Sequence, residues 1–239
     1  MEFYSQSGED IIAYELLKNI SSGFYIEVGA LDGSRFSNTK AFDKHGWKGI
    51  CIEAHPDYID ILIKNRPDSI VIQCAVGENN EDDAIFYTNK RGALSSLSRH
   101  REKEFRTCYG PFFTGYEEIR VKKRSLNSIL EEHKVKSIDL LSIDVEGTER
   151  QVIEGLDLKI YKPTVMIIES SSNFTPLNMD SILIPHGYHR VGIKGPNVIY
   201  ANGIDVSQYI GRKLTAMLHH TPHPEDKDEY KVKECIIVI

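Results

Sequence analysis

The stretch FYIEVGALDGSRFSNT, residues 24–39, decides the fold because an apolar run ends in it abruptly. The run FYIEV is typical of a buried strand, whereas the residues after it are small or acidic and disfavour a strand interior. Such residues belong where a strand stops and the backbone comes close to another group. The stretch therefore predicts a strand that ends at a binding loop.

Strands and helices alternate along the rest of the chain. Further strands are expected at residues 49–54, 69–76, 138–145 and 164–170, and helices at 9–20, 37–44, 56–64, 126–133, 148–156 and 176–186. Because the strands are apolar on both faces and helices connect them, we expect a parallel sheet that is covered on both sides. The segments 188–193 and 197–202 are predicted to form an antiparallel hairpin.

Residues 1–203 are predicted to form one domain, and residues 204–239 an extension packed on that domain. Residues 84–89 read as a further strand or as the start of an inserted ribbon. From 90 to 118 the pattern breaks down into an irregular segment, which predicts a lid or substrate loop because compact domains seldom carry such a length without a use. The tail is expected to hold a helix, a link rich in His and Pro, and an edge strand at its apolar end CIIVI.

Composition narrows the class of protein. The formal net charge of −6 argues against a general affinity for nucleic acid or for an anionic membrane. None of the four cysteines shows CxxC spacing, so neither a zinc site nor a disulfide framework is indicated. The chain starts with the polar MEFYSQSGED and has no apolar stretch of membrane-spanning length. We therefore expect a soluble cytoplasmic protein, and the oligomeric state is left open.

Acidic residues lie where four of the five main strands are expected to end. Glu27 closes the first strand, Glu53 the second, Asp144 with Glu146 the fourth, and Glu169 the fifth. In an open α/β sheet, ligands bind beyond the carboxyl ends of the strands, near the point where the strand order reverses. The shared position of these carboxylates therefore predicts one binding site.

The residue types suggest what this site binds. A carboxylate at the position of Glu53 can accept hydrogen bonds from both hydroxyls of a ribose, and Gly29 and Gly33 let the backbone approach a ligand. No GxGxxG is present, and Asp32 would repel a pyrophosphate, which disfavours NAD. S-adenosylmethionine fits these constraints because it combines ribose hydroxyls with an ammonium and a sulfonium.

Several segments together resemble the FkbM family of S-adenosylmethionine-dependent methyltransferases. They are SQSGED at 5–10, FYIEVGALDGSRFSNT at 24–39, GWKGICIEAHP at 46–56, CAVG at 74–77, IDLLSIDVEGTERQVIEGL at 138–156 and the weaker NVIYA near 197. The resemblance implies the class I methyltransferase fold, an α/β Rossmann-like architecture. In it, a seven-strand, mostly parallel sheet has helices on both faces and an antiparallel C-terminal hairpin.

The resemblance also implies site residues, all of them for the cofactor S-adenosylmethionine. They are Glu27, Gly29, Asp32 and Gly33 in the first-strand loop, Glu53 at the ribose, Ala75 and Val76 beside the adenine, Asp144 near the methyl donor, and Asn38 and Asp10 bordering the same pocket. The family implies O-methylation of a hydroxyl on a sugar, glycan or small natural product. The partner would then be a small-molecule or carbohydrate acceptor.

Methyl transfer from a sulfonium is an in-line displacement, so the protein must position the acceptor hydroxyl and remove its proton. Asp144 and Glu146 are the candidate catalytic bases. Alternatively, Glu146 caps the next helix or pairs with Arg150. A divalent metal held by Asp144 and Glu169 could acidify the hydroxyl instead, but the sequence has no metal motif and we assign no metal ligands.

Three other functions stay open from the sequence. The chain could be a scaffold or nucleoside-binding protein without turnover, but the intact acidic strand ends argue against this. It could be an NAD-linked enzyme, against which the missing GxGxxG argues, or a nucleic-acid methyltransferase, against which the acidic charge balance argues. Arg99, His100 and Arg101 are interpreted as a solvated charge run rather than as substrate contacts. The histidines at 219, 220 and 223 are assigned no ligand role.

Overall fold

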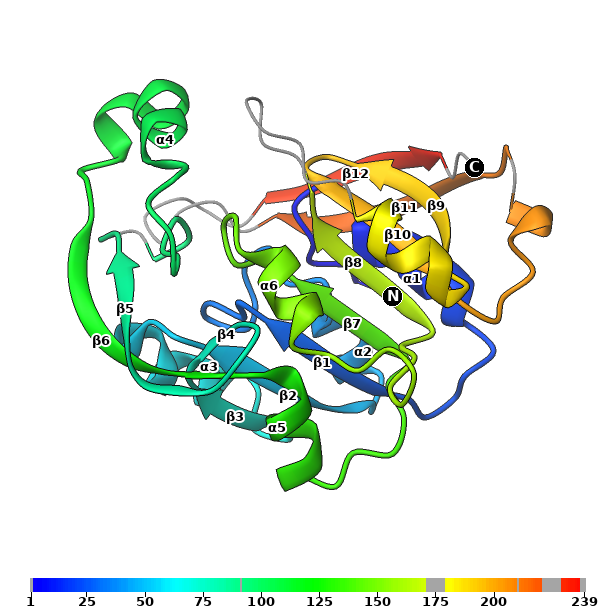
Figure 1. Ribbon diagram of the computed structural model, residues 1–239. Coiled ribbons are helices and arrows are strands. Elements are labelled where there is room, and N and C mark those ends of the chain that lie inside the picture. The colour runs from blue at the N-terminus through cyan, green and yellow to red at the C-terminus, as the bar shows by residue number, and fades with distance from the viewer. Residues whose placement is uncertain (1, 91, 171–178, 210, 221–228, 237–239) are drawn as a thin grey trace.

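The computed structural model describes residues 2–90, 92–170, 179–209, 211–220 and 229–236. Its main sheet has seven strands in the order β3-β2-β1-β7-β8-β10-β9 (Figure 1). The strands are β1 (Phe24–Val28), β2 (Lys48–Glu53), β3 (Ile70–Gln73), β7 (Leu140–Ile143), β8 (Val165–Glu169), β9 (His189–Lys194) and β10 (Asn197–Ala201). All neighbouring pairs from β3 to β8 are parallel, whereas β10 is antiparallel to both β8 and β9. The predicted α/β architecture with a mostly parallel sheet is confirmed, and so is the hairpin of β9 and β10.

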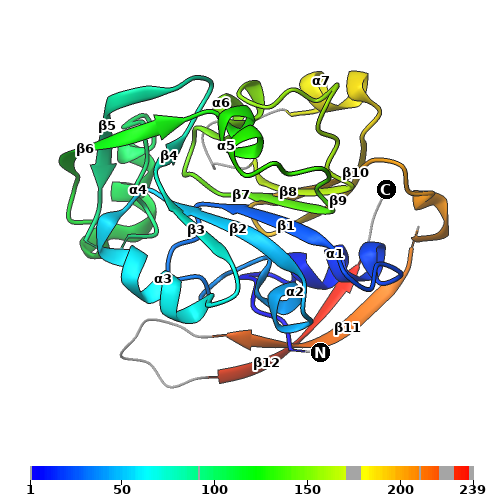
Figure 2. The same ribbon diagram turned by 90° about the horizontal axis from the view of Figure 1, so that it is seen from below.

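Helices cover both faces of this sheet (Figure 2). One face carries α1 (Glu9–Leu17), α2 (Lys40–Lys44) and α3 (Ile59–Asn65), which follows the short 3-10 turn η1 (Pro56–Tyr58). The other face carries α5 (Leu126–Glu132), α6 (Glu149–Glu154) and α7 (Asp180–Leu183), which continues into η3 (Ile184–His186). These helices match the predicted ones, mostly with shorter bounds.

Two apolar cores result from the alternation of side chains along each strand. Tyr25 and Leu140 pack with α1 on one face, whereas Ile26 and Leu141 pack with α5 and α6 on the other. All four side chains are fully buried. Successive residues point to opposite faces of a sheet, so a strand buried on both sides must be apolar throughout, as the sequence is here.

The strand order reverses between β1 and β7. From β1 the chain moves outward through β2 to β3, whereas from β7 it moves in the opposite direction to β8. The loops that leave β1 and β7 therefore diverge, and a crevice opens beyond the carboxyl ends of these two strands. This crevice is where the acidic strand ends of the sequence meet.

The predicted strand 69–76 is wrong, because the chain divides it between two sheets. β3 ends at Gln73, and β4 (Ala75–Val76) then pairs with β6 (Glu117–Arg124) in a three-stranded sheet with β5 (Glu81–Thr88). Cys74 marks the turn, and its N–H still donates to the carbonyl of Glu53 in the main sheet. The second sheet forms the predicted inserted ribbon.

The inserted segment, residues 90–118, is not irregular as predicted. It contains the helix α4 (Glu102–Tyr109) and the turn η2 (Gly110–Phe112) at the far end of the β5–β6 ribbon (Figure 1). Leu94, Phe105 and Phe113 form its own small apolar cluster. The inserted segment is thus stabilised mostly by contacts between its own apolar side chains.

The tail forms a separate hairpin of β11 (Lys213–His220) and β12 (Glu229–Ile236), which lies beside α1 and α2 (Figure 2). Leu218 is fully buried in the same core as α1. Residues 235 and 236 lie in β12 and pair with β11, so the described part of CIIVI is in an edge strand as predicted, in this two-stranded sheet and not in the main sheet. The predicted tail helix is only the 3-10 turn η4 (Val206–Tyr209).

Some predicted features lie outside the described residues: residues 221–228 of the His/Pro-rich link, the last three residues of CIIVI and the start of helix 176–186. Among the residues that the structure does describe, no helix has the length and apolar character needed to cross a membrane.

Candidate functional site

A cleft lies at the carboxyl ends of β1, β2 and β7, and the inserted segment forms part of its wall. The predicted site residues that line it are Glu27, Gly29, Asn38, Glu53, Ala75, Val76, Asp144 and Glu146. Asp10, Asp32 and Gly33 are not among the lining residues. The structure thus brings most of the predicted site together around one cleft.

Glu53 is held so that its carboxylate keeps a fixed orientation at the end of β2. One oxygen accepts a hydrogen bond from the N–H of Leu31 at 2.7 Å, and the other accepts one from the N–H of His55 at 2.7 Å. Burial raises the pKa of Glu53, and these backbone hydrogen bonds oppose that shift. Each carboxylate oxygen has a second lone pair, so Glu53 can still accept hydrogen bonds from a ligand in the cleft.

Glycine is required at residues 29 and 33 by the protein itself. A Cβ at Gly29 would lie 1.7 Å from the backbone oxygen of Asp144, and one at Gly33 would lie 2.5 Å from the side chain of Leu62. Both have positive φ, at 82° and 75°. Packing within the chain thus requires glycine at both positions, and their approach to a ligand stays a prediction.

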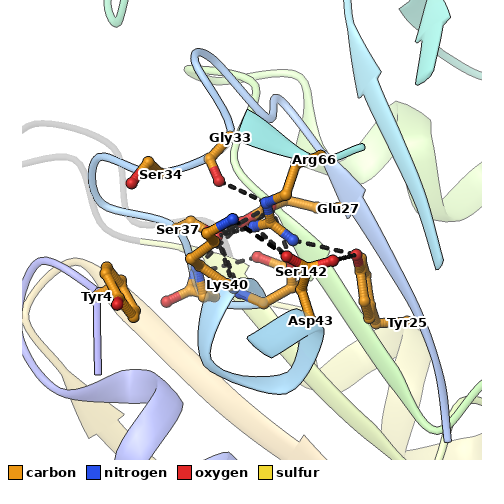
Figure 3. Close-up of polar contacts among 12 residues, drawn as sticks. Tyr4, Tyr25, Glu27, Gly33, Ser34, Ser37, Lys40, Asp43, Arg66 and Ser142 are labelled. Carbon is orange, nitrogen blue, oxygen red and sulfur yellow. Dashed lines mark hydrogen bonds and ion pairs between the residues drawn. The ribbon is translucent and has the colours of Figure 1, made fainter. Parts of the chain in front are cut away.

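Glu27 is the centre of a polar network beneath the loop that follows β1 (Figure 3). Its carboxylate accepts hydrogen bonds from Ser37, Thr39 and the N–H of Asn38, and Arg66 contributes a hydrogen-bonded ion pair at 3.0 Å. Arg66 was not singled out in the sequence. This network fixes the shape of the loop, and a direct contact of Glu27 with the cofactor stays a prediction.

The two predicted acidic residues outside the cleft lining have local partners. Asp10 accepts hydrogen bonds from the N–H groups of Tyr4 and Ser5 and from the Ser5 hydroxyl, so it closes the N-terminal turn. Asp32 accepts from the N–H groups of Ser34 and Arg35. Both therefore shape the chain near the cleft, and their contact with the cofactor stays a prediction.

Backbone strain gathers around the cleft. Leu31, Phe36 and Glu146 have positive φ of 50°, 60° and 59°, and all three line the cleft. Non-glycine residues seldom adopt this conformation, and such strain is common at functional sites. The loops after β1 and β7 are thus held in shapes that the local sequence does not prefer.

At the β7 side of the cleft, Arg101 of the inserted segment joins two strand ends. Its Nη1 lies 2.8 Å from Oε2 of Glu146 and 2.8 Å from Oε2 of Glu169, and its Nε lies 3.2 Å from Oε2 of Glu104. Arg101 is 8% exposed, so the interpretation of this residue as a solvated charge is wrong. Arg99 is half exposed, in keeping with that interpretation.

The carboxyl groups around Arg101 outnumber its single positive charge. Burial raises the pKa of Asp144 and of Glu146 well above the ordinary carboxyl range, and the charge of Glu169 raises both further. Arg101 opposes the shift in both groups. The cluster therefore takes up protons at a higher pH than isolated carboxyl groups would, which is common at catalytic sites.

Glu149, at the start of α6, was missed in the sequence. Its Oε1 accepts hydrogen bonds from the N–H groups of Val145 and Gly147, so Glu149 fixes the loop between β7 and α6. The N-cap of α6 is Thr148, with no side-chain cap hydrogen bond, so the predicted cap by Glu146 is wrong. Arg150, the other partner considered for Glu146, pairs with Glu154 instead. The signal in the sequence that could have pointed to Glu149 is an acidic residue in the first turn of the helix predicted at 148–156.

One group of acidic residues has the spacing of a cation site. Asp144, Glu149 and Glu169 each offer a carboxylate oxygen, and these oxygens lie within 4.8 Å of one another. Glu149 is fully buried, and its Oε2 has no hydrogen-bond donor among the described residues. Three carboxylates suit Mg²⁺ or Mn²⁺, so the residues present fit a divalent metal.

Comparisons with known proteins give both structural and family matches. A TehB-like SAM-dependent methyltransferase from Corynebacterium glutamicum is similar at 8% identity and a TM-score of 0.40, over 83% of this chain and 89% of that chain. A fibrillarin pre-rRNA processing protein from Methanococcus jannaschii is similar at 15% identity and a TM-score of 0.38, over 75% of this chain and 65% of that chain. No curated protein matches the sequence. The model of the methyltransferase FkbM domain matches residues 27–190, more than half of the chain, and the chain therefore belongs to the FkbM methyltransferase family.

Proposed function

We propose that this chain transfers a methyl group from S-adenosylmethionine to a hydroxyl of a sugar, a glycan or a small natural product. S-adenosylmethionine is the expected cofactor of the family, and the strand order around the β1–β7 crevice suits the class I methyltransferase fold. The observation that carries the proposal is Glu53, a buried carboxylate that two backbone N–H groups orient at the end of β2, on the wall of the cleft. This is the group that would accept hydrogen bonds from the ribose.

The charge of the cleft supports the same cofactor. Asp144 lines its β7 side, where negative charge would stabilise a sulfonium and an ammonium. Ala75 and Val76 line it on the β4 side and offer an apolar surface for the adenine. The two sides thus suit the two ends of a cationic nucleoside.

Catalysis would consist of alignment and proton removal. The sulfur, the methyl carbon and the acceptor oxygen must lie in line, and the hydroxyl proton must pass to a base as the new bond forms. Glu146 is the better placed base, since Arg101 holds its Oε2 while the residue lines the cleft. Asp144 is the second candidate.

Calorimetric titration with S-adenosylmethionine and with its demethylated product tests the cofactor. We expect saturable binding of both, no binding of NAD, and an affinity at least tenfold lower in Glu53→Ala, about 1.4 kcal/mol or more. Glu78→Ala, which changes an exposed carboxylate nearby, serves as the matched control. Absence of binding in the intact protein would leave a scaffold without turnover as the better description.

The base is tested by Glu146→Gln once an acceptor has been found among hydroxylated sugars and natural products. Loss of turnover with the cofactor affinity unchanged would support Glu146, because the amide keeps the shape but cannot take the proton. Turnover within a few fold of the unchanged protein would assign the role to Asp144 or to another group. Cofactor binding without methylation of any acceptor would favour the non-catalytic nucleoside-binding protein.

A metal-assisted version of the same reaction is the second candidate. It is favoured by Oε2 of Glu149, which has no hydrogen-bond partner among the residues that the structure describes and lies beside Asp144 and Glu169. A bound Mg²⁺ or Mn²⁺ would acidify the acceptor hydroxyl. Titration of the protein with Mn²⁺, with Glu149→Gln as the variant, gives a readout that does not need activity. Full turnover in excess chelator would exclude this version.

A further inference from the structure

The inserted segment crosses the cleft from one side to the other. Near its start, a Cβ at Gly92 would lie 2.1 Å from the ring of Tyr58, which belongs to the chain that follows β2. Further on, Arg101 reaches the ends of β7 and β8. Between these two contacts, Ala93 and Leu97 line the cleft. The segment is therefore a wall of the cleft that is attached on both sides.

The attachment at the β7 side is close and polar. His100 packs on Gly147, where an added Cβ would lie 2.4 Å from the imidazole ring. The guanidinium of Arg101 lies over the ring of Phe105, with 4.8 Å between Cζ and the ring centroid. Arg101 thus connects the apolar cluster of the inserted segment with the carboxylates of Glu146 and Glu169.

Arg101 itself is not one of the residues that line the cleft. Its effect on a bound acceptor would therefore be indirect, through the carboxylate of Glu146 and through the wall formed by Ala93 and Leu97. Arg101 has two local contacts, with Glu104 and Phe105. Its ion pairs to Glu146 and Glu169, in contrast, join segments 45 and 68 residues apart in the sequence, so its role is not purely local.

We propose that Arg101 is a positioning residue that fastens the inserted segment across the cleft and so completes the acceptor side of the site. This inference rests on the proposed methyl transfer, because only that function identifies one side of the cleft as the side that binds the acceptor. The fastening can be measured without cofactor or acceptor. Failure of the proposed function and failure of this inference are therefore distinguishable.

Hydrogen exchange of the whole protein provides the test, with Arg101→Gln as the variant and Arg99→Gln as the matched control on an exposed neighbour. We expect the amides of α4 to exchange at least tenfold faster in Arg101→Gln, with the amides of β1 unchanged and Arg99→Gln like the unchanged protein. Cofactor affinity should change by less than about threefold, because Arg101 forms its ion pairs with Glu104, Glu146 and Glu169 and not with Glu53 or Glu27. With an acceptor available, KM should rise more than kcat falls.

Arg101→Lys separates positioning from general packing. It keeps the charge, but one ammonium cannot reproduce the fork that meets Glu146, Glu169 and Glu104 together, so α4 should exchange at a rate between those of the unchanged protein and Arg101→Gln. If Arg101→Gln does not fold, the same comparison is made with Arg101→Lys alone. Unchanged exchange of α4 in a folded Arg101 variant would overturn the inference.

Discussion

Two buried arginines each pair with residues that line the cleft, and they have different surroundings. Arg66, at the end of α3, and Arg101, in the inserted segment, have side chains that are 0% and 9% exposed. Each pairs with carboxylates at the carboxyl ends of strands. The guanidinium of Arg66 meets one carboxylate, that of Glu27, and otherwise neutral oxygens. That of Arg101 meets three, from Glu104, Glu146 and Glu169.

The difference teaches what each region is built to do. Around Arg66 the charges balance and the donors have acceptors, so the network holds the loop after β1 in one shape. Around Arg101 the negative charge is in excess, and the carboxyl groups must share protons or a cation. The first region is a scaffold for a loop of the cleft, and the second can take up or release protons beside the cleft.

The largest effect is expected from Arg66→Met, which removes the balancing charge and leaves Glu27 buried. The free energy of unfolding should fall by about 3–5 kcal/mol, as for other buried ion pairs that lose one partner. Urea unfolding, followed by the fluorescence of the only tryptophan, Trp47, measures this. Lys64→Met, on the exposed side of the same helix, is the control. A loss below about 1 kcal/mol would contradict the description of this region as a scaffold.

A smaller effect, visible only as a pH dependence, is expected from Glu149→Gln. Burial raises the pKa of Glu149 to about 7 from its ordinary 4.5. Between these values the folded protein binds more protons than the unfolded chain, so the free energy of unfolding falls as pH rises. The amide cannot titrate, and it should stabilise the protein by about 2 kcal/mol more at pH 8 than at pH 5, relative to the unchanged chain.

This second effect is measured as the difference in urea unfolding between the two proteins at several pH values. Glu154→Gln, in the same helix and exposed, should show no such trend. Parallel pH curves for Glu149→Gln and the unchanged protein would mean that the carboxyl cluster holds no excess charge, and the comparison of the two arginines would lose its basis.

The smallest effects come from removing one partner of each arginine by a substitution of similar shape. Thr39→Val removes the hydroxyl that donates to Glu27 at 2.8 Å and accepts from Arg66 at 3.1 Å, and should cost about 1–2 kcal/mol. Glu104→Gln keeps an acceptor for Arg101 and removes surplus charge, so stability should change by less than about 0.5 kcal/mol. Equal losses of unfolding free energy in Thr39→Val and Glu104→Gln would contradict the distinction between the surroundings of Arg66 and those of Arg101.

The parts of the site that could be predicted from the sequence are the residues that stand directly after the apolar strands. Glu53, Asp144 and Glu146 follow apolar runs directly, and parallel strands bring their carboxyl ends to one edge of the sheet, so these residues meet at the cleft. The order of strands and helices is predictable for the same reason. Neither inference needs knowledge of distant contacts.

The two arginines could not be predicted, because their burial depends on contacts far along the chain. Arg66 stands at a helix end before Pro67 and reads as a surface charge, yet it meets Glu27 across 39 residues. Arg101 stands among charged neighbours and meets Glu169 across 68 residues. The division of 69–76 has a similar cause, since Ala75 and Val76 pair with Lys123 and Arg124.

The β5–β6 ribbon has a consequence for how proteins of this architecture can diverge. It carries an apolar cluster of its own at its far end, built around Phe105 and Phe113, while the two main cores lie elsewhere. Changes confined to that cluster would leave the side chains of the two main cores in place. Under the function proposed above, recognition of the methyl donor and choice of the methylated compound would lie on separate parts of the chain, and a graft of another ribbon tip would test whether the acceptor changes.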